Sequence, residues 1–322
     1  MPSRNLLQYL IITAKGLAMG AADVVPGVSG GTIAFISGIY EELIETINKL
    51  DFKFFKIWKK EGFLSAWRCY NLGFLTSLLI GIAISILSLS KIITLLLMNQ
   101  PILVWSFFFG LVIASILFIG KQITNWSISI WFALIIAFGL SYYITLAEPI
   151  GSPESTWFLF LSGFIAIIAM ILPGISGAFI LLLLGAYQSV IGTITDLSEG
   201  VTKMNWELFS QAFIKLFVFG LGAIVGIKVF SKALNWMFKY HKNLILSILT
   251  GFMIGALNKI WPWKEVIQYR TNHHGEKIPF IEKSILPNHY FEDPQLLYAF
   301  IFMALGFLSI FILERISSFK ST

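Results

Sequence analysis

Two short stretches of the chain place proline, glycine and serine in the same order: residues 26–30 (PGVSG) and residues 173–177 (PGISG). Proline removes a backbone donor and interrupts a helix, glycine permits unusual dihedral angles, and serine can cap the start of a new helix. Each stretch is therefore expected to end one helix and begin another. The first turn of the new helix offers unpaired amide protons and the positive end of the helix dipole, which suits an anion such as a phosphate.

The two helix starts are predicted to converge on one substrate site. Irregular backbone at membrane depth is tolerated only where it is buried in protein or lines a water-filled cavity, and inverted-repeat transporters bind substrate at such broken helices. The alternative is that the glycines only allow close helix packing. A substrate site is favoured because proline adjoins glycine in both stretches. The predicted substrate-binding residues are Lys15, Gly27, Ser29, Gly30, Gly31, Thr32, Gly174, Ser176 and Gly177.

Asp23 lies just before the first of these stretches. A carboxylate within a membrane segment is a candidate for ion coupling, so Asp23 is predicted to bind a proton or a sodium ion. Two alternatives stay open: Asp23 pairs with Lys15, or it binds backbone amides in a purely structural role. Lys15 could contact the phosphate or extend to the membrane interface. No catalytic residue, cofactor or metal site is predicted, since the histidine pair His273 and His274 has no further ligands at useful spacing.

The composition indicates that these residues lie in a membrane protein. Apolar residues make up 57% of the chain and charged residues 12%, and the mean hydropathy is +0.81. Several uncharged runs reach the roughly 20 apolar residues that one membrane span needs. Cys69 is the only cysteine, which excludes an intramolecular disulfide framework. The net charge of +6 comes from loops that flank apolar runs, so it predicts membrane topology rather than a nucleic-acid partner.

The chain contains an internal repeat. Residues 26–50 and 173–197 align without a gap, and eleven of the 25 positions are identical. Chance in so biased a composition would give roughly two or three identities. The predicted units are residues 1–147 and 157–322, with an external loop at about 261–294 in the second, and together they form one integral membrane domain.

Each unit is expected to hold five apolar elements, namely a broken or re-entrant helix pair followed by three transmembrane helices. The predicted ranges are 6–25, 28–47, 72–89, 102–119 and 128–146 in the first unit, and 157–172, 175–194, 208–230, 244–260 and 296–313 in the second. The number of crossings per unit is odd whether the pair spans the membrane or turns back. The fold class is therefore all-α and polytopic, with two inverted-topology repeats.

Loop charge predicts the orientation. The connection from Asn48 to Tyr70 carries six basic residues, whereas residues 147–156 carry none. By the positive-inside rule the first loop is cytoplasmic and the second external, which places both termini in the cytoplasm. Aromatic residues alternate with lysines in the cytoplasmic connection, so it is predicted to lie flat on the anionic inner leaflet.

The two helix-breaking stretches and their surroundings resemble a known family. The segment from Gly16 to Leu43 (GLAMGAADVVPGVSGGTIAFISGIYEEL) and the segment from Leu172 to Tyr187 (LPGISGAFILLLLGAY) are similar to the bacterial polyprenyl-phosphate transporters of the PopT type, formerly a domain of unknown function. The resemblance covers nearly the whole chain. It implies a flippase of the bacterial cytoplasmic membrane that returns undecaprenyl phosphate from the outer to the inner leaflet, where this carrier lipid is reused for peptidoglycan and other cell-envelope polymers.

Two other functions are alternatives to lipid transport. Membrane undecaprenyl-pyrophosphate phosphatases also have inverted repeats and a Pro-Gly-x-Ser stretch, but they place an arginine after the serine and use nearby glutamates. Gly30 and Gly177 follow the serines here, so charge stabilisation for phosphoryl transfer is lacking and the chain is predicted not to be an enzyme. A transporter of a small soluble anion is the other alternative.

Overall fold

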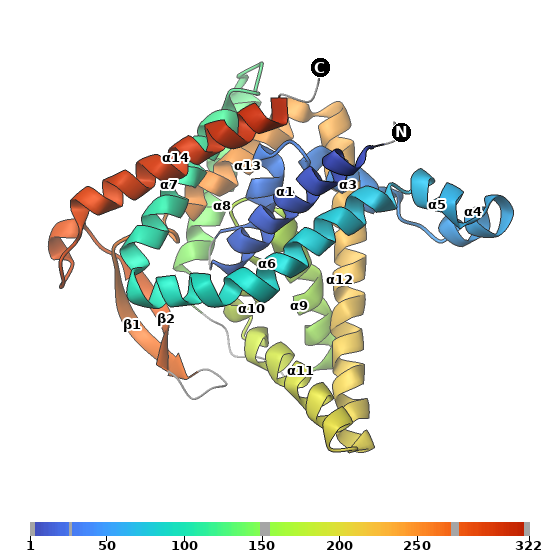
Figure 1. The fold of residues 1–322 in the computed structure, drawn as a ribbon. Coiled ribbons are helices and arrows are strands. Elements are labelled where there is room, and N and C mark those ends of the chain that lie inside the picture. Colours follow the sequence, from blue (N-terminus) through green and yellow to red (C-terminus); the bar gives the residue numbers. More distant parts are fainter. Residues whose placement is uncertain (1–3, 26–27, 149–154, 272–276, 319–322) are drawn as a thin grey trace.

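The computed structural model describes residues 4–25, 28–148, 155–271 and 277–318, and it is mainly helical (Figure 1). The first half contains α1 (Leu6–Val24), α2 (Gly30–Ile36), α3 (Tyr40–Lys49), α4 (Lys53–Glu61), α5 (Phe63–Cys69), α6 (Leu72–Asn99), α7 (Pro101–Gly120) and α8 (Ile128–Leu146). The second contains α9 (Thr156–Ile171), α10 (Gly177–Leu183), α11 (Ala186–Thr202), α12 (Trp206–Tyr240), α13 (Lys242–Ala256), β1 (Lys264–Thr271), β2 (Lys277–Ser284), a 3-10 turn (Pro287–His289) and α14 (Leu296–Ser318).

Several helices have the length and composition of membrane spans. In the described part of the chain, α6, α7, α8 and α12 are long and apolar enough to cross a bilayer, and α9, α13 and α14 are shorter apolar helices. The pair α10 and α11 also qualifies, although it is bent by 107°. Large apolar side chains remain exposed along these helices, as expected where lipid rather than water is the solvent. The structure thus confirms a helical, multi-pass membrane protein.

The two halves use the same close helix packing at equivalent positions. On α1, a Cβ atom at Gly16 would collide with the carbonyl oxygen of Leu78 on α6. On α9, a Cβ atom at Gly163 would collide with the carbonyl oxygen of Phe219 on α12. The alignment pairs Gly16 with Gly163 and Leu78 with Phe219, so the contacts are counterparts. This agreement supports the repeat, while its unit boundaries and the inverted orientation of its copies stay predictions.

The remaining long helices connect the halves to each other. Helix α7 packs against α14, and α8 packs against α13. Gly110 of α7 lies against the backbone of Met303, and Gly306 of α14 lies against the backbone of Phe107. Because each contact joins one helix from either half, the two copies interlock.

The first close contact provides a stability test. Gly81→Ala is expected to lower the free energy of unfolding by about 1–3 kcal/mol, because the new methyl group would meet the carbonyl oxygen of Thr13 and force α1 and α6 apart. Denaturant unfolding in mixed micelles would measure this. Gly139→Ala is the matched control, since nothing lies within 4 Å of a Cβ atom there. Equal stability of the two variants would contradict the proposed packing.

Two elements that were predicted to be continuous are each broken in the structure. Residues 28–47 and 175–194 were expected to form single helices, but the structure breaks them at Gly38 and Gly185, whose φ angles are +72° and +69°. The left-handed region favours glycine, and the two glycines are equivalent in the repeat. Each helix-breaking stretch is therefore followed by a helix of seven residues and a second turn.

The inserted loop contains two β-strands, which the predicted all-α fold class did not include. β1 and β2 form an antiparallel hairpin at the lower left of Figure 1, with a register irregularity after Val266. The indole of Trp261 donates to the carbonyl of Ile285 at 2.8 Å, and the indole of Trp263 donates to the carbonyl of Pro294 at 2.9 Å. These bonds hold the hairpin against the ends of α13 and α14.

The basic connection between the third and sixth helices forms α4 and α5, which project from the bundle (Figure 1). No residue of α4 is buried. Phe52, Phe55 and Trp58 are exposed beside the lysines. Placement of these helices on the inner leaflet stays a prediction.

Candidate functional site

The two helix-breaking stretches, called here the first turn (residues 28–32) and the second turn (residues 172–177), meet in the structure. The hydroxyl of Ser29 donates to the carbonyl oxygens of Met170 at 3.3 Å and Leu172 at 3.1 Å. The hydroxyl oxygen of Thr32 accepts a hydrogen bond from the amide of Gly174 at 3.1 Å. The turns therefore face each other, whereas Pro26, Gly27 and the pair His273 and His274 lie outside the described residues.

The amides at the start of α2 already have partners. Asp23 accepts a hydrogen bond from the amide of Gly30 at 2.6 Å, and the hydroxyl oxygen of Ser29 accepts one from the amide of Gly31 at 3.1 Å. A Cβ atom at Gly30 would lie 2.5 Å from the carboxylate, so only glycine fits. The Asp23 carboxylate thus occupies the position that an anionic ligand of this helix would take.

Lys15 lies at the other end of the same short helix. Its ammonium donates to the carbonyl oxygen of Ser37, the C-terminal cap of α2, at 2.6 Å. A carboxylate at the start of a helix and an ammonium at its end both stabilise the helix dipole. Asp23 and Lys15 therefore bind opposite ends of α2. Contact of Lys15 with phosphate stays a prediction.

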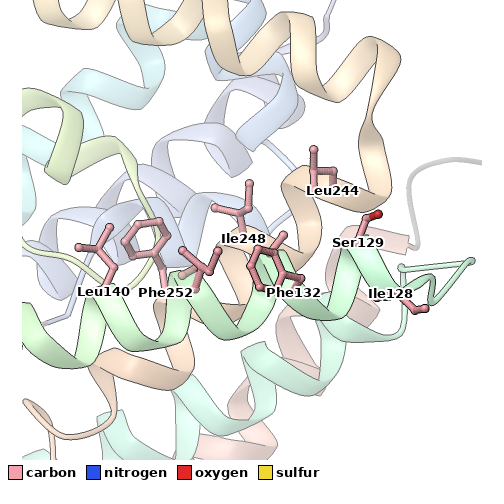
Figure 2. Close-up of a pocket in the computed structure, with 10 residues that line it drawn as sticks. Ile128, Ser129, Phe132, Leu140, Leu244, Ile248 and Phe252 are labelled. Atoms are coloured by element: carbon pink, nitrogen blue, oxygen red, sulfur yellow. The ribbon is translucent and has the colours of Figure 1, made fainter.

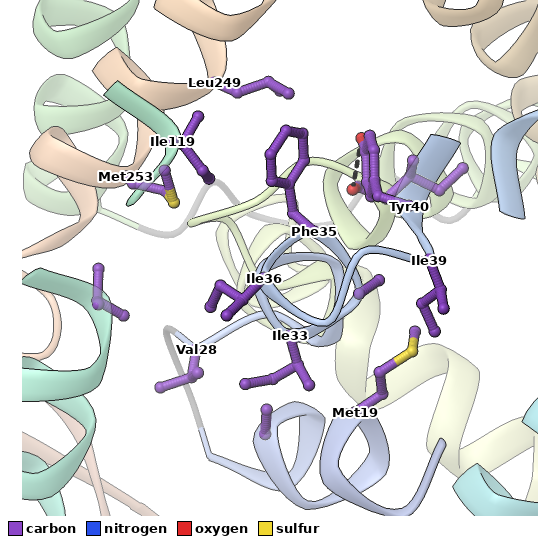
Figure 3. Close-up of a cluster of buried hydrophobic side chains, with 14 of the residues drawn as sticks. Met19, Val28, Ile33, Phe35, Ile36, Ile39, Tyr40, Ile119, Leu249 and Met253 are labelled. Carbon is purple, nitrogen blue, oxygen red and sulfur yellow. Dashed lines mark hydrogen bonds between the residues drawn. The ribbon is translucent and has the colours of Figure 1, made fainter. Parts of the chain in front are cut away.

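The first turn is enclosed by apolar side chains. Every residue of α2 is buried. Val28, Ile33 and Phe35 belong to one buried apolar cluster with Leu249 and Met253 (Figure 3). In the same region the Tyr40 hydroxyl donates a hydrogen bond of 3.1 Å to the carbonyl of Ile171. The turns are therefore in direct contact and covered by apolar side chains, an arrangement called closed below.

The second turn is more accessible than the first. Gly177 is partly exposed and Ala178 is exposed, whereas Ser29, Gly30 and Gly31 are all buried. Ser176 precedes α10 and makes no side-chain capping bond, unlike Ser29. The two turns share a sequence pattern but differ in the hydrogen bonds of their serines.

An apolar groove of about 580 Å³ runs between α8 and α13 (Figure 2). Phe132, Leu140, Ile248 and Phe252 are among the side chains that line it. None of the predicted site residues that the structure describes lines this groove. Phe252 also packs in a buried cluster with Ile175 of the second turn, so the groove ends beside that turn.

Sequence reasoning missed several lysines. Lys228 on α12 donates to the carbonyl oxygens of Ile47 at 3.1 Å and Asn48 at 2.9 Å, and also to that of Leu50, so it caps the end of α3. A lysine inside a long apolar helix was the available signal. Lys264, in the inserted loop, was also missed because loop lysines were used only to predict topology. Lys259 was missed as well, although it lies within the predicted element 244–260, where a lysine in an apolar run was again the available signal.

Comparison with known proteins places this geometry in a family. A family model described as VCA0040-like, undecaprenyl phosphate translocase-like, matches residues 19–278, which include both turns. The chain belongs to this family. It is 42% identical over 281 residues to a polyprenyl-phosphate transporter of Vibrio cholerae serotype O1, covering 87% of each chain. It is 33% identical over 262 residues to a polyprenyl-phosphate transporter of Staphylococcus aureus, covering 77% of this chain and 84% of the relative. No solved structure matches it significantly.

The family assignment confirms the resemblance seen in the two motifs. The relatives that match are named as transporters, which agrees with a chain that is not an enzyme.

Proposed function

We propose that this protein transports undecaprenyl phosphate across the bacterial cytoplasmic membrane, from the outer to the inner leaflet. The observation that carries the proposal is the meeting of two helix-breaking turns in a chain whose relatives are polyprenyl-phosphate transporters. Broken helices supply the amide donors that a phosphate needs at membrane depth.

Alternating access follows from the closed arrangement of the turns. Ser29 and Thr32 bind the second turn directly, so their hydroxyl groups become available to substrate when the turns separate. The phosphate then takes the hydrogen bonds that the turns make to each other. Exchange between these two sets of bonds would let the site open to either side of the membrane.

Asp23 couples the cycle to an ion in this proposal. Its carboxylate and the phosphate compete for the same amide of Gly30, because both are anions at one helix start. Protonation of Asp23 removes its charge and leaves that position to the phosphate. A sodium ion held by the carboxylate would have the same effect.

The apolar groove between α8 and α13 is suited to the isoprenoid tail. Its lining is apolar apart from Ser129, and it ends beside the second turn. A lipid could then keep its tail in the membrane while its phosphate enters the protein. A small soluble anion would not need such a groove, which favours a lipid cargo.

Translocation by the wild-type protein is the direct test. Proteoliposomes would receive fluorescent polyprenyl phosphate in the outer leaflet, and a membrane-impermeant quencher would report the fraction that remains there. We expect translocation well above that of protein-free liposomes, driven by a proton or sodium gradient. The same preparation would be assayed for phosphate release from undecaprenyl pyrophosphate. Hydrolysis without lipid movement would favour the phosphatase alternative, and movement of inorganic phosphate alone would favour the small-anion alternative.

A further inference from the structure

Near the start of α10, two lysines and one glutamate form a largely buried cluster that the closed site does not use. Lys259 follows α13, Lys264 begins β1, and Glu282 lies on β2. The carboxylate of Glu282 is 3.8 Å from the Lys259 ammonium and 3.6 Å from the Lys264 ammonium. Both separations are longer than hydrogen bonds, and two positive charges share one negative charge.

Lys264 is the most constrained member of this cluster. Its side chain is only 7% exposed, and its ammonium makes no hydrogen bond to any residue that the structure describes. The ammonium lies 3.3 Å from the ring centroid of Trp105 on α7, a cation–π contact. Burial lowers the pKa of Lys264 to about 7, opposed by the charge of Glu282. Burying a cation with only one carboxylate nearby costs free energy, so a second anion would stabilise the protonated Lys264.

The cluster also contacts α10, which directly follows the second turn. The Lys259 ammonium lies 4.8 Å from the ring centroid of Phe179, the third residue of α10. The repeat alignment pairs Phe179 with Thr32, which binds Gly174 in the closed arrangement. An anion held by Lys259 would therefore lie close to the more accessible of the two turns.

The hairpin holds the cluster in place. The Ser284 hydroxyl donates to the carbonyl of Asn258 at 2.9 Å, which ties β2 to the turn that carries Lys259. Asn258 and Ser284 also line a groove of about 340 Å³, whose other walls include Phe109 and Leu257. An apolar chain could lie in this groove while its anionic head meets the lysines.

We propose that Lys259 and Lys264 form an entry site for a phosphate monoester, on the hairpin side of the second turn. Two ammonium groups whose N–H donors are not all used suit a phosphate. The carboxylate of Glu282 partly neutralises their positive charge until the ligand binds. This inference rests on the proposed function, because it names where the substrate headgroup first binds.

Equilibrium binding tests this site without requiring translocation. Wild-type protein in phosphatidylcholine nanodiscs would be titrated with undecaprenyl phosphate, undecaprenol and inorganic phosphate. The double variant Lys259→Met with Lys264→Met is expected to bind undecaprenyl phosphate at least about tenfold more weakly, since charge-assisted hydrogen bonds are the stronger class. Binding of undecaprenol should not change. The control is Lys283→Met, an exposed lysine on β2 next to Glu282, which should bind like wild type.

The variant Glu282→Gln tests whether Glu282 competes with the phosphate for the lysines or only supports the structure. Measured at a pH low enough to keep both lysines protonated, removal of the competing carboxylate should tighten phosphate binding severalfold, whereas a purely structural Glu282 would give weaker binding or none. Lys264→Met is expected to fold at least as stably as wild type, because a buried cation is replaced by an apolar side chain of similar length. Its unfolding curve therefore shows whether a loss of affinity comes from loss of fold.

The outcomes distinguish this inference from the proposed function. Wild-type protein that binds no phosphate lipid would overturn both. Wild-type binding that the folded double variant retains in full would overturn the entry site alone. Competition by inorganic phosphate that depends on the two lysines would assign the site to any phosphate monoester, and lysine-dependent binding of the lipid alone would assign it to the lipid headgroup.

Discussion

Alanine at both Ser29 and Ser176 is expected to reduce translocation of undecaprenyl phosphate by at least about tenfold, since a hydrogen bond to a charged group contributes roughly 1.5–3 kcal/mol. Each serine precedes the first residue of a helix, where its hydroxyl can reach an anion bound to that helix start. The quencher assay on proteoliposomes measures the loss.

The single variants should differ, because the two serines have different partners. Ser29 caps α2 and also binds Leu172, so Ser29→Ala should lower the free energy of unfolding by about 1 kcal/mol as well as slow transport. Ser176 makes no capping bond, so Ser176→Ala should leave stability nearly unchanged while transport falls. Thermal unfolding of each purified variant measures the first quantity, and the quencher assay the second.

Ser88→Ala is the matched control for these serines. Ser88 is exposed on α6 and donates to the carbonyl of Ile84 within its own helix. Its loss should affect neither transport nor stability noticeably. Wild-type rates in the folded double variant of Ser29 and Ser176 would remove both serines from the site.

The internal repeat recurs in the helix packing, whereas the helix ends were predicted less well. Gly16 and Gly81 recur at repeat-equivalent positions, and the structure uses their counterparts in the same contacts. The breaks at Gly38 and Gly185 were missed because an isolated glycine in an apolar run is compatible with a continuous helix. Whether such a glycine adopts a positive φ depends on tertiary contacts, which periodicity does not report.

The meeting of the two turns was predictable, but their hydrogen bonds were not. The repeated PGxSG pattern indicated two helix starts that converge, and the structure brings Ser29 against the second turn. Sequence spacing could not show that Lys15 binds the end of α2 while Asp23 binds its start, because both lie on one helix that runs beside α2. Partner choice at this level depends on the direction in which the helices pack.

The β-hairpin was missed for a different reason. Lys264 to Thr271 contains β-branched and aromatic residues, which is a strand signal. The charges of this loop were used only to predict membrane topology, and the strand signal in its sequence was overlooked. Lys264 was missed for the same reason, and its burial against Trp105 of α7 depends on how the hairpin folds.

Asp23→Asn is expected to abolish the dependence of transport on an ion gradient, so that rates with and without the gradient become equal. The asparagine carbonyl can still accept the hydrogen bond from the amide of Gly30, but the side chain takes up no proton at neutral pH and has no negative charge to hold a sodium ion. The variant therefore retains the cap and loses the exchangeable charge. Proteoliposomes prepared with proton, sodium or no gradient would measure the ratio of rates.

Asp23→Ala completes the test because it removes both the charge and the acceptor. If Asp23 is only a structural cap, asparagine should behave like wild type, and alanine should lower stability by about 1–3 kcal/mol because the amide of Gly30 is left unpaired. If Asp23 couples transport to an ion, asparagine and alanine should lose gradient dependence equally, although only alanine should be unstable. Full gradient stimulation in Asp23→Asn would place the coupling group elsewhere and leave Asp23 with its structural role.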